Sequence, residues 1–135
     1  MARTVLLGKT EQKKKKIDAM KATNEALDAG IATIKPGNTA DDVAQKFLDV
    51  LDKYNIKKES RTGYSIGIGY PPDWGEHTLN IQKRDKTILQ PNVTFHMIAI
   101  IQFGNWGVES SESIRVTENA YELLCNFSRG LHIKE

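Results

Sequence analysis

The spacing of apolar residues changes once along this sequence, close to residue 60, and this change restricts the folds that the chain can adopt. Upstream, apolar side chains recur every three or four residues over 11–34 and 39–54, as on one face of an amphipathic helix. Downstream, runs rich in β-branched and aromatic residues alternate with turn residues. The first stripe has one polar break, at Asn24, and the two stripes comprise Ile17, Met20, Leu27, Ile31, Ile34 and Val43, Phe47, Val50, Leu51, Tyr54.

Capping and turn residues set the expected ends of the two helices. Thr10 is a suitable N-cap for the first helix. The segment 35–38 ends it, because its proline disfavours helical backbone in the residue before it. Thr39 and Asp42 have the spacing of a capping box for the second helix, and Asn55 is a left-handed stop. We therefore expect a helical hairpin.

The second half of the chain predicts a run of antiparallel strands. Helices that precede a run of strands favour an α+β fold, with the helices on one face of a curved antiparallel sheet. We expect 1–135 to form a single domain, since this length buries an ordinary core. A hairpin tip is expected at 83–85 and a tail over 126–135. The expected strands are 3–7, 64–70, 93–103, 108–117 and 121–125.

Composition excludes several classes of partner. A formal net charge of +2 is too small to predict nucleic-acid binding, and the basic run 13–16 is read as a solvated helix end. No window approaches the roughly 18 apolar residues of a membrane span. The single cysteine, Cys125, cannot form an internal disulfide, which fits a reducing compartment. These features predict a cytoplasmic protein that binds neither nucleic acid nor membrane.

The stretch 61–78, RTGYSIGIGYPPDWGEHT, concentrates the unusual residues of the chain. Gly63, Gly67 and Gly69 weaken a strand unless a ligand or another backbone approaches closely. The loop that follows ends in Glu76 and His77, a carboxylate and an imidazole suited to acid–base or metal chemistry. If the protein has a site, this stretch should line it.

Individual residues leave alternatives open. His96 lies in the strongest predicted strand and is either a half-buried structural histidine or a functional one. Trp74 and Trp106 either form an aromatic wall for a ligand or belong to the core. The side chains that could ligate a metal do not stand at a tight ligand spacing; they are Asp73, Glu76, His77, His96, Glu109 and Glu112.

Several motifs resemble the pita-bread family of creatinase, prolidase and aminopeptidase P. The likeness covers nearly the whole chain: KPGNTADDV between the helices, GYSIGIG, QPNVTFHMI, and VESSESIRVTENAYELL near the end. The segment SRTGYSIG, followed by PPDWGEHT and later TFH, resembles the ectoine-hydrolase-like branch of that family most. The resemblance implies a partial pita-bread fold and places this chain at the C-terminal part of the family's catalytic domain.

The family's hydrolysis of C–N bonds uses two metal ions held by two aspartates, one histidine and two glutamates, and this sequence departs from that set. Tyr64 stands in place of the histidine and Ile98 in place of one glutamate. The other glutamate falls on Ser111, or on Glu109 or Glu112 with a small shift. Both aspartates would precede residue 1. The resemblance therefore implies no metal site and no cofactor here.

The residues that remain resemble the substrate-facing half of a hydrolase site. The resemblance implies that His77 binds or protonates the leaving group and that Trp74 packs on the substrate. We expect a small-molecule or peptide-like ligand, and no C–N hydrolysis by the chain alone. The implied catalytic residues are Glu76, His77 and Glu112, and the implied substrate-binding residues are Tyr64, Trp74, His96 and Glu109.

Two other interpretations follow from the same resemblance. A sheet that lacks its first strands exposes an edge, and an exposed edge invites pairing with another chain. The protein could thus be a non-catalytic binding module, expected as a homodimer or larger oligomer with 3–7 near the interface. Alternatively, a separate chain supplies the missing strands.

Overall fold

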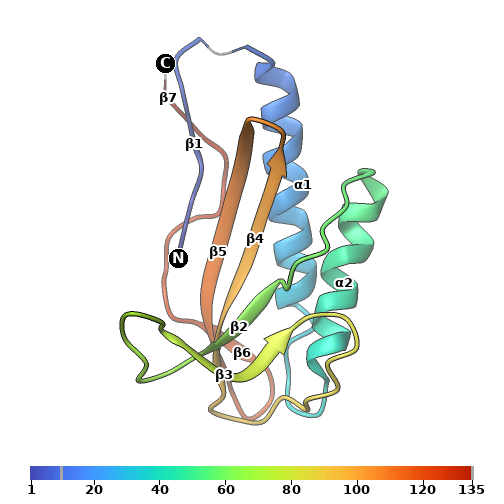
Figure 1. The fold of residues 1–135 in the computed structure, drawn as a ribbon, viewed down its shortest axis with the longest axis vertical. Helices are drawn as coiled ribbons and strands as arrows, with labels where there is room; N and C mark the ends of the chain where they lie inside the picture. The colour runs from blue at the N-terminus through green and yellow to red at the C-terminus, as the bar shows by residue number, and fades with distance from the viewer. Residues whose placement is uncertain (10, 135) are drawn as a thin grey trace.

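Two helices lie on one face of a five-stranded antiparallel sheet, as the computed structural model of residues 1–9 and 11–134 shows (Figure 1). The strand order is β3-β2-β4-β5-β6. The expected α+β architecture, a helical hairpin on a curved antiparallel sheet, is confirmed. The elements of this layer pair are α1 (Lys13–Ile31), α2 (Ala40–Lys53), β2 (Gly63–Ile66), β3 (Gly75–Ile81), β4 (Thr94–Phe103), β5 (Trp106–Val116) and β6 (Tyr121–Leu123).

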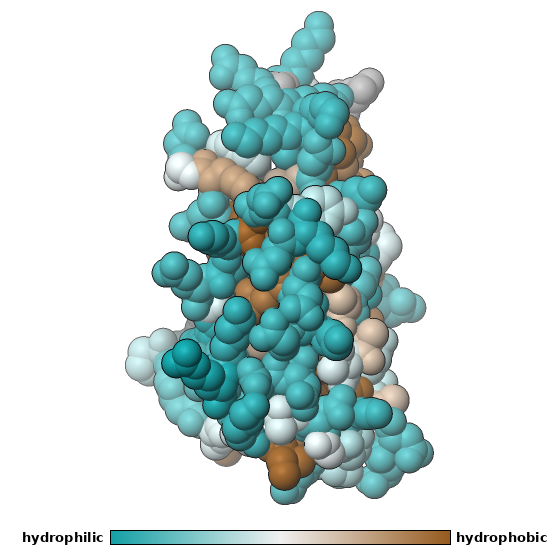
Figure 2. All heavy atoms as spheres, turned by 90° about the vertical axis from the view of Figure 1, so that its right-hand side faces the viewer, coloured by the Kyte–Doolittle hydropathy of each residue, from teal (hydrophilic) through white to brown (hydrophobic). Residues whose placement is uncertain are grey.

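The helical hairpin forms as its capping residues predict. Thr39 and Asp42 form a complete capping box at the start of α2, and Asn55 is left-handed with φ 54° just beyond its end. The predicted cap of α1, Thr10, lies outside the described residues. Gly30 allows close contact between α1, α2 and β4, because a Cβ there would collide with Met97 and lie 3.3 Å from Phe47 Cβ. The outer face on the α2 side is mainly hydrophilic, as expected for helices whose apolar stripes point inward (Figure 2).

The longest ladder, between β4 and β5, divides the sheet into two different faces. Ten residue pairs run from Thr94↔Arg115 to Phe103↔Trp106 without a register shift. Side chains alternate between faces along each strand. Phe95 and Met97 point toward the helices and are fully buried, whereas His96 between them points to the other face. One face of this ladder thus forms the core, and the opposite face is free to carry a site.

Three predicted elements differ from the structure. The strand expected over 64–70 ends at Ile66, and 67–74 forms a loop instead. The loop expected to end at Glu76–His77 ends before Gly75, where β3 begins. The sequence did not predict this strand. The expected tail contains β7 (His132–Lys134), which pairs in parallel with β1 (Val5–Leu7) as a separate two-stranded sheet. Residues distant in sequence supply the partners of these short strands, which local patterns do not encode.

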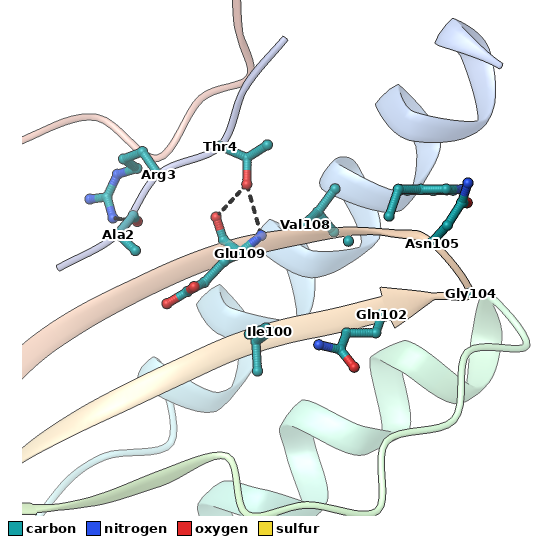
Figure 3. A pocket seen from close by; sticks show the side chains of 11 residues that line it. Ala2, Arg3, Thr4, Ile100, Gln102, Gly104, Asn105, Val108 and Glu109 are labelled. Atoms are coloured by element: carbon teal, nitrogen blue, oxygen red, sulfur yellow. Dashed lines mark hydrogen bonds between the residues drawn. The ribbon is translucent and has the colours of Figure 1, made fainter. Parts of the chain in front are cut away.

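The N-terminal segment continues the sheet along β5. Ala2 forms an antiparallel bridge with Ser111, where its carbonyl accepts from Ser111 N–H at 3.1 Å. The Thr4 hydroxyl donates to the carbonyl of Glu109 and accepts from its N–H, each at 2.8 Å (Figure 3). The segment therefore lies beside the half of β5 that β6 does not cover. Neither described helix is long and apolar enough to cross a membrane.

A buried charge cluster joins both ends of the chain to the helix-facing side of β5. Glu112 is fully buried, and its Oε1 accepts from the guanidinium groups of Arg3 and Arg129. Arg129 also donates to Asp28 on α1, at 2.9 Å from its Nε. Arg3 further donates to the carbonyls of Phe127 and Ser128. One carboxylate thus holds the N-terminal segment, the C-terminal segment and, through Arg129, α1 against one strand.

Replacing Glu112 with glutamine should destabilise the fold strongly. The substitution leaves the guanidinium of Arg3 buried without its counter-charge, a change that costs about 3–5 kcal/mol in buried pairs. Urea denaturation would measure the free energy of unfolding. Glu122→Gln is the matched control, since Glu122 pairs with Arg115 on the exposed edge. Equal, small effects of the two substitutions would contradict the role assigned to the cluster.

Candidate functional site

Tyr64 and His96 are brought together by the β2–β4 pairing on the sheet face that points away from the helices. They are direct cross-strand partners. The Tyr64 hydroxyl lies 3.3 Å from Nδ1 of His96, and the rings meet edge to face at a centroid distance of 5.6 Å. The Arg61 guanidinium lies over the Tyr64 ring at 4.7 Å and donates to Asn80 Oδ1. This arrangement places an aromatic hydroxyl and an imidazole side by side.

His96 is held in its neutral form. Burial first, and then the positive charge of the amino terminus, lower the pKa of His96 to about 4. Its Nε2 is buried and has no hydrogen-bond partner among the described residues. Near neutral pH this imidazole therefore offers a hydrogen bond without a charge.

The glycines of the 67–74 loop make room for the side chain of Glu76. The Gly69 N–H donates to Glu76 Oε1 at 2.5 Å. A Cβ on Gly67 or Gly69 would lie 3.1 or 2.9 Å from the same oxygen. The close approach that these glycines predicted is thus made by a carboxylate of this chain. Glu76 anchors the loop, and its predicted catalytic role stays a prediction.

His77 and Asp73 form a pair at the start of β3. Nε2 of His77 lies 2.7 Å from Asp73 Oδ2, and Asp73 Oδ1 accepts from the Gly75 N–H at 2.8 Å. The hydrogen bond from Gly75, followed by that from His77, lowers the pKa of the Asp73 carboxyl below its usual range. His77 has φ 55°, a left-handed conformation uncommon for a residue other than glycine. Both side chains remain largely exposed.

The two tryptophans lie at opposite ends of the sheet. Trp74 is on the 67–74 loop with 54% of its surface exposed, and the loop also exposes Ile68 and Tyr70. Trp106 is at the β4–β5 turn, where it stacks on Phe103 at 4.5 Å and packs against the core. Figure 1 shows the turn and the loop well apart. Trp74 is thus the tryptophan available to a ligand near Tyr64.

The structure separates Glu109 and Glu112 from the other predicted site residues. Glu112 points to the helix-facing side and belongs to the buried charge cluster. Glu109 points to the opposite side and lines a cavity of about 530 Å³ between the N-terminal segment and the β4–β5 hairpin (Figure 3). Neither Tyr64 nor His77 lines this cavity. Their predicted roles in the site remain predictions.

Sequence reasoning missed the partners that hold the site residues. The sequence indicates Asp73 only as a possible metal ligand, although its separation of four residues from His77 is also compatible with a pair. Nothing local predicted that Arg61 would cover the Tyr64 ring or that Arg3 and Arg129 would meet at one carboxylate. These contacts join segments whose proximity only the folded chain decides.

Comparisons with known proteins give a consistent result. The sequence model of Metallopeptidase family M24 matches residues 1–118. Ectoine hydrolase of Halomonas elongata is 41% identical over 99% of this chain and 33% of its own length. An uncharacterized hydrolase/peptidase of Sinorhizobium fredii is 33% identical over 100% of this chain and 34% of its own.

Solved structures agree on the fold. The crystal structure of dipeptidase PepE from Mycobacterium ulcerans superposes with a TM-score of 0.86 and 25% identity, over 97% of this chain and 34% of that one. The chain therefore spans about a third of the length of the relatives that it matches. The resemblance to pita-bread proteins is confirmed.

The positions at which the pita-bread resemblance expects metal ligands do not fit a divalent cation here. Ile98 stands in place of one glutamate, and its direct cross-strand partner is Ser111, one of the three positions, with Glu109 and Glu112, on which the other glutamate could fall. Ile98 has no donor atom, and the Ser111 hydroxyl already accepts from the Ala2 N–H at 2.7 Å. Tyr64 offers a phenol in place of an imidazole. Across 1–9 and 11–134, no cluster of three potential ligands is found.

His96 should make the stability of the fold depend on pH. Its pKa in the folded chain, about 4, is below the value of about 6.5 for a free histidine, so over this window the unfolded state binds a proton that the folded state does not. Stability should therefore fall as the pH drops from about 6.5 to about 4. Urea denaturation at several pH values would measure the free energy of unfolding. In His96→Gln this free energy should decrease less steeply with falling pH, by at most about 1.4 kcal/mol per pH unit. Parallel profiles would contradict this prediction.

Proposed function

Because the chain belongs to Metallopeptidase family M24, we propose that it forms the substrate-facing part of a site for C–N bond hydrolysis that works without the family's two-metal centre. One observation carries this proposal: Ile98 and Ser111, paired across β4 and β5, replace the expected carboxylates, while the neighbouring 61–78 stretch keeps an imidazole, a phenol and an exposed tryptophan. The 41% identity to an ectoine hydrolase supports a cyclic or peptide-like amide or amidine as the ligand.

Each predicted site residue has a role in the proposed site. His77 protonates the nitrogen that leaves when the C–N bond breaks. Neutral His96, next to Tyr64, binds polar atoms of the ligand, and Trp74 packs on its ring. Glu76 keeps the loop closed around its glycines. Glu109 and Glu112 are proposed to support the site from β5, the first beside the cavity and the second through the charge cluster.

The chain alone lacks the group that attacks the carbon. Among the described residues, no carboxylate is hydrogen-bonded to Tyr64 or to His96. We therefore propose that the attacking group, or the activated water, comes from residues that this chain does not contain. On its own the chain binds at most part of the substrate.

The isolated chain should not turn over ectoine or Xaa-Pro dipeptides, with or without Mn²⁺. The metal should bring no activity, because the ligand positions offer an alkyl group and two hydroxyls already hydrogen-bonded within the chain. Release of the free amine would be followed by chromatography, with a metal-dependent Xaa-Pro dipeptidase as a positive control. Turnover in either condition would overturn the proposal.

Self-association is a second candidate function, and exposed apolar residues on the small β1–β7 sheet favour it. Val5 and Leu7 expose 52% and 65% of their surface, and Ile133 beside them exposes 43%. Each strand of a two-stranded sheet also has one unpaired edge, which another chain can extend. This supports the prediction that 3–7 lies near the interface of a homodimer.

Sedimentation should give a mass of about twice the 15.2 kDa of one chain. Leu7→Glu should shift the protein toward monomer by placing a charge on the proposed contact, since a buried unpaired charge is costly. The matched control is Leu124→Glu, at an exposed apolar residue outside the β1–β7 sheet. A monomer for the unsubstituted chain would contradict this candidate function.

A further inference from the structure

The histidines of this chain differ in their ability to transfer a proton. His96 has a pKa near 4, because burial and then the amino terminus disfavour its charged form, so at neutral pH it is not an imidazolium that could act as an acid. His132 is on β7, which pairs with β1 outside the main sheet. His77 alone stands on the 61–78 stretch with a carboxylate in contact. Among the histidines, proton transfer at the proposed site therefore falls to His77.

We infer that Asp73 is the positioning residue of His77, and that Nδ1 of His77 is the nitrogen that exchanges a proton with the ligand. This inference rests on the proposed function and deepens it. An ionised carboxylate only accepts hydrogen bonds, so the 2.7 Å contact places the proton of the pair on Nε2. The other nitrogen, Nδ1, is then the one free to accept or deliver a proton. The relation is that of the aspartate and histidine in a catalytic triad.

Hydrogen bonds hold both carboxylate oxygens of Asp73, whereas a chance contact on the surface would engage only one of them. Its Oδ1 accepts from the Gly75 N–H at 2.8 Å while Oδ2 faces His77. Both oxygens are thus engaged, and the carboxylate cannot turn away without losing a hydrogen bond. The pKa of Asp73 is lowered by these same two hydrogen bonds, so the carboxylate stays ionised under ordinary conditions.

His77 is held from the backbone as well. Its φ of 55° is uncommon for a residue with a side chain, and such conformations persist where surrounding contacts impose them. The adjacent residue, Glu76, is bound to Gly69 N–H across the loop, which limits movement on the N-terminal side of His77. The orientation of the imidazole is therefore set by local contacts.

The pair stands close to the aromatic part of the proposed site. A Cβ on Gly75, which lies between Asp73 and His77 in the chain, would be 3.5 Å from the Tyr64 ring, so the backbone that joins the pair passes close to that ring. Arg61 lies over the same ring and is close enough to Asp73 to contribute to lowering its pKa. In the proposed site, a ligand that packs on Trp74 and contacts Tyr64 therefore lies next to the Asp73–His77 pair.

The proton balance of the step is simple. When water, activated outside this chain, adds its oxygen to the carbon, the C–N bond breaks and its electron pair goes to the nitrogen. That nitrogen takes the proton from Nδ1 of the His77 imidazolium. The proton released from the attacking water restores the imidazolium, so each cycle consumes one water and leaves the protein unchanged.

Nuclear magnetic resonance of the ¹⁵N-labelled chain tests the inference without any turnover. The spectra would be recorded above the ordinary imidazole pKa of about 6.5, where the two neutral tautomers of His77 are distinguished by which ring nitrogen carries hydrogen. We expect the Nε2–H tautomer to dominate in the unsubstituted chain. In Asp73→Asn, whose amide can donate to Nε2, the ratio should move toward Nδ1–H by roughly two- to fivefold, the range that exposed pairs supply.

Two further variants complete the design. Asp73→Glu keeps the carboxylate and should keep most of the Nε2–H population, whereas Asp52→Asn removes an exposed helical carboxylate far from His77 in sequence and should change nothing. An unchanged tautomer ratio in Asp73→Asn would overturn the inference, and so would an equal shift in Asp52→Asn. Because this readout does not involve hydrolysis, a failure of the proposed function would show separately, as turnover by the isolated chain.

Discussion

The β4–β5 ladder is the constraint on which the rest of the structure depends. Its ten pairs keep one register, so the faces of both strands are assigned together. Because side chains alternate, a slip of one residue would expose Phe95 and bury His96. The ladder thus fixes the core under the helices, the place of Glu112 inside that core, and the opposition of Ile98 and Ser111 on the other face.

The same ladder decides on which face of the sheet the expected ligand positions lie. The positions at which the resemblance expects ligands lie on the face away from the helices, as Ile98 and Ser111 show. Isoleucine and serine at 98 and 111 are accommodated there, and the Ser111 hydroxyl gains a partner in Ala2. The buried carboxylate of Glu112, one residue further on, serves the opposite face and the chain ends. Ser111 and Glu112, which are adjacent on β5, therefore contribute to opposite faces of the sheet.

In the 67–74 loop, glycines make room for a side chain of the same protein. Gly67 and Gly69 leave space that Glu76 fills, and this contact fixes the residues that follow. Asp73, near the end of this loop, pairs with His77 at the start of β3. The loop thus carries Trp74 as an exposed side chain outside the core.

The sequence by itself determined the helical hairpin, its capping box, the β4–β5 hairpin and the family, because these depend on local periodicity, local hydrogen bonds and contiguous motifs. It also singled out the 61–78 stretch. Only the tertiary structure decided that 67–70 leaves the sheet, that β7 pairs with β1, and that Glu112 and His96 lie on opposite faces. Those outcomes depend on which distant segments meet, and a backbone group or charge takes the partner that folding brings to it, wherever that partner stands in the sequence.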